Sequence, residues 1–284
     1  MHSQKIHNKK LILPVLIFLA GCLALAAVLY HSYRTNLKHM RAVTELNATT
    51  YAERLQNDMN RGVAITDTLE EIVLSENGKI DNFQKVAGNL MTDFVQSIQI
   101  APNGVVTDIY PEAGNEAEKI DLIHDESRGE ICRYGRDKNI VTMQGPFDLK
   151  QGGRGIAIRN PVYLECPDGT SAFWGFTIVI IRIPEVFEKS VQSLTQIVYD
   201  YCLTKTVSPL SDDTEVVSAS GNILKEPITF EFEFCGSTFG LEVMPTDGWN
   251  HGWNILPQLV FGICIILLLT GLTVIVLVVE RHRE

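Results

Sequence analysis

Two long apolar segments, one near each end of the chain, constrain this sequence more than any other feature. Leu11–Tyr30 runs for twenty residues and Ile255–Val279 for twenty-five, and neither contains a charged side chain. A bilayer core about 30 Å thick is crossed by roughly 20 apolar residues in a helix that rises about 1.5 Å per residue. We therefore expect two transmembrane helices, with the polar residues between them on one side of the membrane and both tails on the other.

The distribution of lysine and arginine around the second segment predicts which side faces the cytoplasm. Cytoplasmic flanks carry an excess of both residue types. Arg281 and Arg283 follow the segment directly, whereas Leu241–Asn254 before it contains neither type. Trp249 and Trp253 lie where an aromatic belt would meet the outer surface. We expect a two-pass protein of the cell membrane with cytoplasmic termini and an extracytoplasmic middle segment.

The first apolar segment has a second interpretation. Leu19-Ala20-Gly21-Cys22 resembles a bacterial lipobox, at which a signal peptide is cleaved and the cysteine becomes lipidated. The sequence stays apolar from Leu23 to Tyr30, which favours an uncleaved span over a lipidated Cys22. Under either interpretation the middle segment faces outward.

The segment between the two spans is acidic. It contains 19 Lys and Arg against 32 Asp and Glu, a net charge of −13 in a chain of net charge −10. A surface of this sign repels phosphate backbones, so we expect no nucleic-acid partner. Its length suits one domain, or two small ones, with a real core. A membrane-tethered outer module of this kind favours sensing or binding over metabolism.

The cysteines leave disulfide formation open. Cys22 and Cys264 lie in the apolar segments, and four others lie between them: Cys132, Cys166, Cys202 and Cys235. An oxidising compartment permits disulfides, and four cysteines allow three pairings. Proximity in the sequence favours Cys132–Cys166 and Cys202–Cys235, with free or buried thiols as the alternative. No CxxC motif or His/Cys cluster indicates a metal site, and no motif indicates a cofactor.

The first part of the middle segment has the pattern of one long helix. Residues 31–76 contain no proline and carry apolar residues at helical spacing, among them Leu37, Leu55 and Leu69. At about 1.5 Å per residue, such a stalk helix would be roughly 65 Å long. A helix of this length must pack along a domain, a second copy of the chain, or both.

The remainder of the middle segment reads as strands separated by turns and short helices. In a membrane-distal unit, 77–198, we expect these strands: Ser97–Ile100, Val105–Tyr110, Ile140–Met143, Gly155–Leu164 and Ala172–Ile183. In a membrane-proximal unit, 199–254, we expect three more: Tyr199–Thr204, Ile228–Phe234 and Thr238–Val243. Short helices are expected within Glu116–Asp137 and over Pro184–Val198.

This order of elements predicts an α+β fold, with a five-stranded antiparallel sheet and a ligand pocket on one of its faces. The expected division of the chain is therefore as follows: tail 1–10, span 11–30, stalk helix 31–76, distal unit 77–198, proximal unit 199–254, span 255–279 and tail 280–284.

Five ordered blocks of the sequence resemble the CHASE domain. They are Ser97–Gly104 (SIQIAPNG), Tyr110–Glu116 (YPEAGNE), Gly145–Leu149 (GPFDL), Gly155–Tyr163 (GIAIRNPVY) and Phe173–Phe176 (FWGF). The resemblance covers about 50–200. It implies an extracytoplasmic sensor flanked by two spans, with a long stalk helix followed by two PAS-like units. It also implies binding and no catalysis. Plant members of the family recognise adenine-type cytokinins, but their acidic ligand contact has no matching position here.

The resemblance also implies partners. CHASE proteins continue past the second span into a histidine kinase, a diguanylate cyclase or a nucleotide cyclase, whereas this chain ends at Glu284. We expect a receptor that binds a small extracellular ligand, forms a homodimer and acts through such an effector, as a partner protein or a continuation. A proline at Leu55 should then abolish signal coupling and spare ligand binding. The alternative is a membrane-anchored adaptor or scaffold without a small-molecule ligand.

The candidate ligand contacts lie on the expected strands of the distal unit. Ser97 and Gln99 share one strand face and could supply polar contacts. The other candidates match family blocks or lie beside them: Met143, Phe147, Ile156, Ile158, Tyr163 and Trp174. Successive residues of a strand point to opposite faces, so about half of this set should line the pocket and the rest belong to the core.

Two other clusters have simpler interpretations. The glycines from Gly145 to Gly155 match no phosphate-binding motif and are better explained as turn residues. His124-Asp125-Glu126 has metal-ligating residue types, but adjacent residues on a helix point in different directions. No Ser/His/Asp set is apparent, so we expect no enzyme activity.

Overall fold

The computed structural model describes residues 2–113, 120–188, 190, 194, 198–249 and 254–283, with side chains from residue 12 onward. It divides into two units, which are treated separately. One consists of Met1–Val43 with Asp247–Glu284, and the other is Thr44–Thr246. Three expectations therefore lie wholly or partly outside the described residues: Trp253, the start of the 116–137 region, and most of the helix expected over 184–198.

The first unit contains two helices long and apolar enough to cross a membrane. They are the first part of α1 (His2–Ser75) and α5 (Ile255–Arg283). The two helices approach closely at glycines. A methyl group on Gly21 would lie 2.9 Å from Cγ1 of Ile266, and one on Gly262 would lie 2.3 Å from Cδ1 of Leu25. Small residues at such contacts are typical of helix pairs in membranes, where they let backbones come together.

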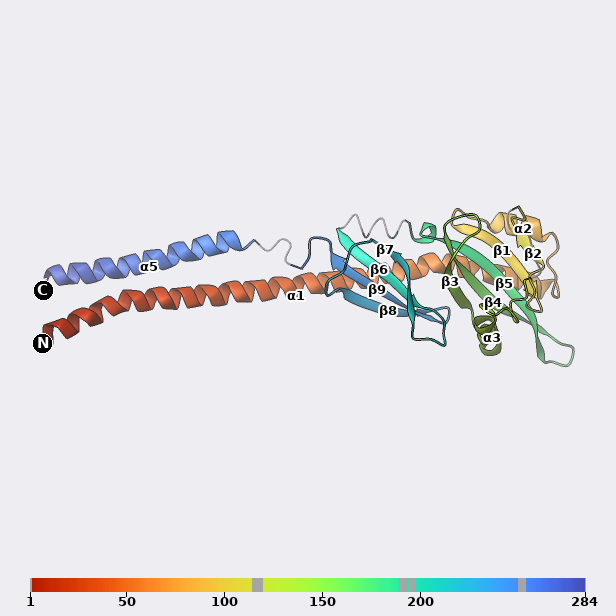
Figure 1. Cartoon of the computed structure of the whole chain (residues 1–284), viewed down its shortest axis with the longest axis horizontal. Helices are drawn as coiled ribbons and strands as arrows, with labels where there is room; N and C mark the ends of the chain where they lie inside the picture. Colours follow the sequence, from red (N-terminus) through yellow and green to blue (C-terminus); the bar gives the residue numbers. More distant parts are fainter. Residues whose placement is uncertain are drawn as a thin grey trace. The chain divides into compact units, whose positions relative to one another are not determined.

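The second unit contains two antiparallel sheets (Figure 1). The first has the strand order β2-β1-β5-β4-β3, formed by β1 (Val95–Pro102), β2 (Asp108–Tyr110), β3 (Thr142–Asp148), β4 (Arg154–Glu165) and β5 (Ser171–Ile183). The second has the order β7-β6-β9-β8, formed by β6 (Tyr199–Thr206), β7 (Thr214–Ala219), β8 (Ile228–Phe234) and β9 (Ser237–Pro245). The α+β class and the five-stranded antiparallel sheet are confirmed.

One strand was not expected from the sequence. β7 pairs only with β6 and lies at the edge of the second sheet. Five of its six residues are at least partly exposed, and only Val217 is buried. An edge strand of this kind lacks the apolar alternation that marks a strand with one buried face, so its pattern resembles that of a loop.

Short helices complete the second unit. α2 (Phe83–Leu90) precedes β1, and α3 (Gly129–Lys138) lies in the region where short polar helices were expected. The helix expected from Pro184 begins as the 3₁₀ turn η1 (Glu185–Phe187). α3 is preceded by Asp125, whose carboxylate accepts hydrogen bonds from the backbone N–H groups of Ser127 and Arg128, both at 2.9 Å.

Within the second unit, α1 packs along both sheets and supplies one side of their common core (Figure 1). Most of its buried core residues are separated by three or four positions, or by a multiple of three: Ala48, Tyr51, Ala52, Leu55, Met59, Ile65 and Leu69. This spacing places them on one stripe of the helix. Gly62 lies in the same stripe, and a methyl group there would be 2.7 Å from Cδ1 of Ile158. The stalk helix therefore buries its apolar face against the domain that follows it in the sequence.

The predicted disulfides are not formed, since all four cysteines of the middle segment are free thiols. Cys202 pairs with Glu242 in the sheet, and Cys235 lies seven residues from Glu242 along the chain. The five strand steps from Ser237 to Glu242 alone span about 17 Å, far beyond the ~7 Å Cα separation that a disulfide tolerates. Cys132 is buried on α3, while Cys166 is in the turn that joins β4 to β5. Proximity in the sequence was a poor guide here because Cys202 lies within β6, whereas Cys235 lies in the turn between β8 and β9.

Candidate ligand-binding site

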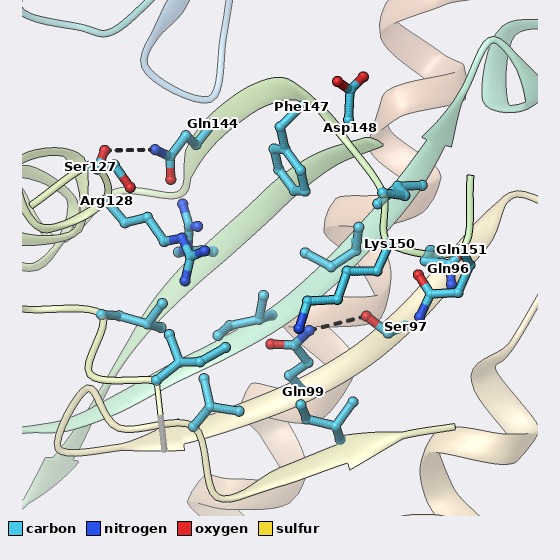
Figure 2. Close-up of a pocket in the computed structure, with 18 residues that line it drawn as sticks. Gln96, Ser97, Gln99, Ser127, Arg128, Gln144, Phe147, Asp148, Lys150 and Gln151 are labelled. Carbon is cyan, nitrogen blue, oxygen red and sulfur yellow. Dashed lines mark hydrogen bonds between the residues drawn. The ribbon is translucent and has the colours of Figure 1, made fainter. Parts of the chain in front are cut away.

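A pocket of about 510 Å³ lies on the face of the five-stranded sheet opposite α1 (Figure 2). Its floor is formed by β1, β3, β4 and β5. Its walls come from residues 149–151 and from Val106, Ile109, Ile120, Leu122, Ser127 and Arg128. The volume falls within the range of about 300–1,000 Å³ that is usual for small-molecule sites.

The register of the sheet explains which side chains face the pocket, because directly paired residues point to the same face. One row crosses four strands through Gln99, Ile178, Arg159 and Thr142. The next row on this face crosses them through Ser97, Ile180, Ala157 and Gln144. Six of these eight residues line the pocket. The other two, Thr142 and Ala157, are fully buried on the same face.

The opposite face of the sheet packs on α1. Its central row consists of Ile98, Val179, Ile158 and Met143, all fully buried in the core that includes α1. Ile156 belongs to the same core. The alternation predicted from the sequence is therefore present, and the face of each residue follows from its position in the strand.

The predicted ligand contacts consequently fall into two groups. Ser97, Gln99 and Phe147 line the pocket. Met143, Ile156 and Ile158 do not, because they are on the face that packs against α1. The structure places these three in the core, which corrects the prediction that they contact a ligand.

The remaining two candidates also have structural contacts and do not line the pocket. The hydroxyl of Tyr163 donates a hydrogen bond to the backbone carbonyl of Arg136 at the end of α3. The indole Nε1 of Trp174 donates one to the carbonyl of Gly78, at 3.0 Å, just after α1 ends. Both side chains therefore join a helix end to the sheet.

Arg159 is the pocket residue with the least usual environment. Its side chain is only 4% exposed, yet it lines the pocket from the middle of β4. Among the described residues, nothing forms a hydrogen bond with its Nε or Nη1. Burial lowers the pKa of this guanidinium from its ordinary value. An arginine nevertheless stays protonated in proteins, so a positive charge is held at the floor of the pocket.

Arg128 also lines the pocket and extends from the start of α3 (Figure 2). It is close enough to Arg159 for the two positive charges to interact. Its Nη1 is 3.7 Å from a carboxylate oxygen of Asp125. The hydrogen bonds that Asp125 accepts, from Ser127 first and then from the backbone, hold the pKa of that carboxyl below its usual range. Asp125 is thus already engaged with its own turn and with Arg128.

Amide groups provide further polar contacts (Figure 2). Nε2 of Gln144 donates a hydrogen bond to the carbonyl of Ser127 at 2.9 Å. Its Oε1 is buried and has no partner among the described residues. Nε2 of Gln99 donates to Oγ of Ser97 at 3.1 Å. The pocket therefore presents both hydrogen-bond donors and a free acceptor.

The charge of the pocket is opposite to that of the chain. Among the described residues that line it, Arg128, Lys150 and Arg159 stand against one carboxylate, Asp148, which points away from the cavity (Figure 2). Lys150 reaches across the pocket toward Gln99 (Figure 2). Positive side chains that line a cavity focus the electric field there and attract anions, even in a domain of negative net charge.

Most of the pocket residues were not predicted from the sequence. The missed polar members are Gln96, Ser127, Arg128, Gln144, Asp148, Lys150, Gln151 and Arg159. A signal for Arg159 does exist, since it is a charged residue within the apolar run of β4. It alternates with Ile158 and so had to face away from that residue. For the wall residues no comparable signal exists, because they lie in irregular segments.

In the part of the chain that the structure describes, no group of three or more His, Cys, Asp or Glu side chains is arranged to hold a metal ion.

Comparison with known proteins gives a family and a fold. The CHASE domain family matches residues 31–215. No curated protein matches the sequence. Among solved structures, an extracellular ligand-binding receptor from Desulfohalobium retbaense is similar over 69% of this chain, with a TM-score of 0.52 and 12% identity. This chain spans only 39% of that receptor's length.

Two further solved structures are similar at TM-scores of 0.47. The periplasmic sensory domain of the Campylobacter jejuni chemoreceptor Tlp1 is 14% identical, over 77% of this chain and 99% of that one. The periplasmic domain of RsbU from Chlamydia trachomatis is 9% identical, over 77% of this chain and 96% of that one.

Proposed function

This chain belongs to the CHASE domain family, and from that premise we propose that it is a membrane-bound receptor that binds a small extracellular ligand in the pocket of its five-stranded sheet. The family match makes it a sensor domain of the extracellular type, flanked by two helices able to cross a membrane. The ligand, the transmission of a signal and the cytoplasmic location of both termini are parts of the proposal.

One observation carries the proposal: the two faces of the same sheet contact different parts of the molecule. One face lines the pocket, and the other packs on α1, a helix that is continuous from the first apolar segment to Ser75. The strands that would contact a ligand are therefore the strands that contact α1. Movement of β4 or β5 on ligand binding would alter their packing against this helix.

Signal transmission would follow from a shift between two packings of the second unit. A ligand that prefers one packing changes their relative populations. Coupling free energies of about 1–3 kcal/mol are typical of such systems. α1 is the element best suited to carry the change, by a small translation or rotation.

The other parts of the receptor are proposed on the same basis. We retain 77–198 as the membrane-distal PAS-like unit and 199–254 as the proximal one. Arg281 and Arg283 at the end of α5 support cytoplasmic termini. A histidine kinase or a cyclase, as a partner or a continuation of the chain, would receive the signal, and a homodimer is the expected form.

A binding screen with a blocked-pocket variant tests the proposal. The full chain in lipid nanodiscs is screened by thermal shift against a library of small metabolites. Gln99→Trp fills the pocket from β1, and Thr229→Trp places the same side chain on an exposed position of β8 as the control. Compounds that stabilise the wild type should stabilise Thr229→Trp equally and Gln99→Trp little or not at all.

Two outcomes would contradict the proposal. If no compound in the library raises the melting temperature of the wild type, the adaptor or scaffold function becomes the better explanation. If compounds bind but stabilise Gln99→Trp as much as the control, the ligand site lies elsewhere in the chain.

A further inference from the structure

We propose that the pocket selects an organic carboxylate, with Arg159 as the residue that binds its negative charge. The inference rests on the proposed function and names the chemical class of its ligand. A buried charge in a protein is normally paired or hydrogen-bonded, and Arg159 departs from this rule. At least two nitrogens of Arg159 are not paired within the described part of the chain.

The charged groups around Arg159 do not compensate it. Those that influence it are Cys132, Arg128 and Asp125. Burial raises the pKa of the Cys132 thiol above its usual range, which keeps it neutral. Arg128 adds a second positive charge, and Asp125 is already engaged by Arg128 and by its own turn. No described residue therefore supplies an anion that would neutralise the positive charge at the floor of the pocket.

The shape of the guanidinium selects the kind of anion. Arginine presents N–H donors in a planar arrangement that matches the geometry of carboxylate and phosphate groups. The rest of the pocket argues against a small inorganic anion, because much of its lining is aliphatic: Val106, Ile109, Ile120, Leu122, Ile178 and Ile180. Such a wall suits a ligand with an apolar body attached to its charged group. Inorganic phosphate has no such body.

The free acceptor of Gln144 adds a second requirement. Gln144 pairs with Ala157, and Thr142 pairs with Arg159, so Gln144 is the diagonal neighbour of Arg159 on the adjacent strand. Diagonal neighbours of an antiparallel pair lie about 7–8 Å apart. A ligand that satisfies both residues carries a hydrogen-bond donor, such as a hydroxyl or an amino group, close to its carboxylate.

The test compares acids with their neutral analogues on the full chain in nanodiscs. The probes are lactate, succinate, benzoate, alanine and leucine, each with its amide, and inorganic phosphate. Binding is measured by calorimetry to the wild type and three variants. Arg159→Gln removes the charge and Arg159→Lys retains it without the planar group. Arg54→Gln removes an exposed arginine of α1 as the control.

We expect at least one acid to bind the wild type and its amide to bind far more weakly. Arg159→Gln should lower the affinity for that acid roughly 10- to 100-fold, which is the effect of losing hydrogen bonds to a charged group. Arg159→Lys should recover part of it, and Arg54→Gln should bind like the wild type. Without ligand, Arg159→Gln should melt at a higher temperature than the wild type, because it removes a buried unpaired charge.

Several results would overturn the inference. It fails if the amides bind as well as the acids, if Arg159→Gln binds the acid with unchanged affinity, or if phosphate binds more tightly than every acid. It also fails, while the receptor function stands, if the metabolite library yields only neutral or cationic ligands that Gln99→Trp blocks. If nothing binds in either experiment, both proposals fall together.

Discussion

At the scale of single residues, two buried cations illustrate opposite solutions to one physical problem. Lys205 in the second sheet has no exposed surface, but its Nζ donates to the carbonyl of Thr206 at 2.6 Å and to Glu215 at 3.0 Å. Burial lowers the pKa of Lys205, and the contact with Glu215 opposes this effect. Arg159 has no comparable partner among the described residues. The first arrangement is structural, and we interpret the second as a site kept ready for an anion.

The Lys205 pair supplies a prediction about stability. Glu215→Gln removes the negative charge and leaves the buried ammonium with weaker acceptors. We expect the free energy of unfolding to fall by about 2 kcal/mol, less than for a fully buried pair because Glu215 is partly exposed. Urea denaturation of the full chain in detergent measures it. The exposed Glu231→Gln on β8 is the control.

The double variant Lys205→Met with Glu215→Gln tests whether the loss of stability comes from the buried charge of Lys205. It removes both members of the pair and should be more stable than Glu215→Gln alone, because no buried charge remains. Equal unfolding free energies for Glu215→Gln and the wild type would show that the pair contributes nothing.

At the scale of elements, the close approach of α1 to the five-stranded sheet explains why a glycine lies within the helix. Gly62 faces Ile158 and Ile181, and neither could keep its position if a side chain were added. Glycine weakens a helix by roughly 1 kcal/mol relative to alanine. Its presence here is explained by packing, because the absence of a side chain lets the helix lie directly on the sheet.

Replacing Gly62 with a larger residue tests its packing. Gly62→Leu inserts four carbons into a filled interface, and overpacking of this kind costs about 1–3 kcal/mol. Ala64→Leu makes a similar change on the exposed side of the same helix and should be nearly neutral. Thermal unfolding followed by circular dichroism compares them. Equal melting temperatures would mean that α1 and the sheet separate easily.

At the scale of the whole molecule, the structure changes how signal transmission should be tested. A proline at Leu55 was expected to break coupling and spare binding, but Leu55 is 2% exposed and lies in the common core. A proline there would disturb the folding of the second unit itself. The helix has to be interrupted at an exposed position outside that unit, and Lys38 is such a position.

We therefore predict that Lys38→Pro preserves ligand binding and abolishes its effect on the apolar helices. Proline removes a backbone hydrogen bond and kinks a helix interior. The readout is the rate of disulfide formation between Leu25→Cys and Gly262→Cys, whose side chains would be in contact, in a background without the native cysteines. Ligand should change this rate in Lys38→Ala but not in Lys38→Pro. A ligand-dependent change that survives the proline would exclude transmission through a continuous α1.

The sequence by itself determined the features that depend on local chemistry. Apolar length defined the two helices able to cross a membrane, and helical periodicity defined the stalk. Strand-like runs bounded by turns indicated the strands of the five-stranded sheet. It also determined that Arg159 and Ile158 lie on opposite faces of β4, because side chains alternate along any strand. The ordered family blocks led to the CHASE family, which the family match confirms.

Only the tertiary structure decided which face of the sheet is the pocket. Alternation is symmetrical, so Ile156 and Ile158 could have faced either a ligand or the stalk until α1 was placed against them. The pairing of Gln99 with Ile178, and of Ile178 with Arg159, joins residues far apart in the chain. No local pattern encodes such contacts, because they depend on how strands align in space. The pocket exists only once the strands and their connecting segments are assembled.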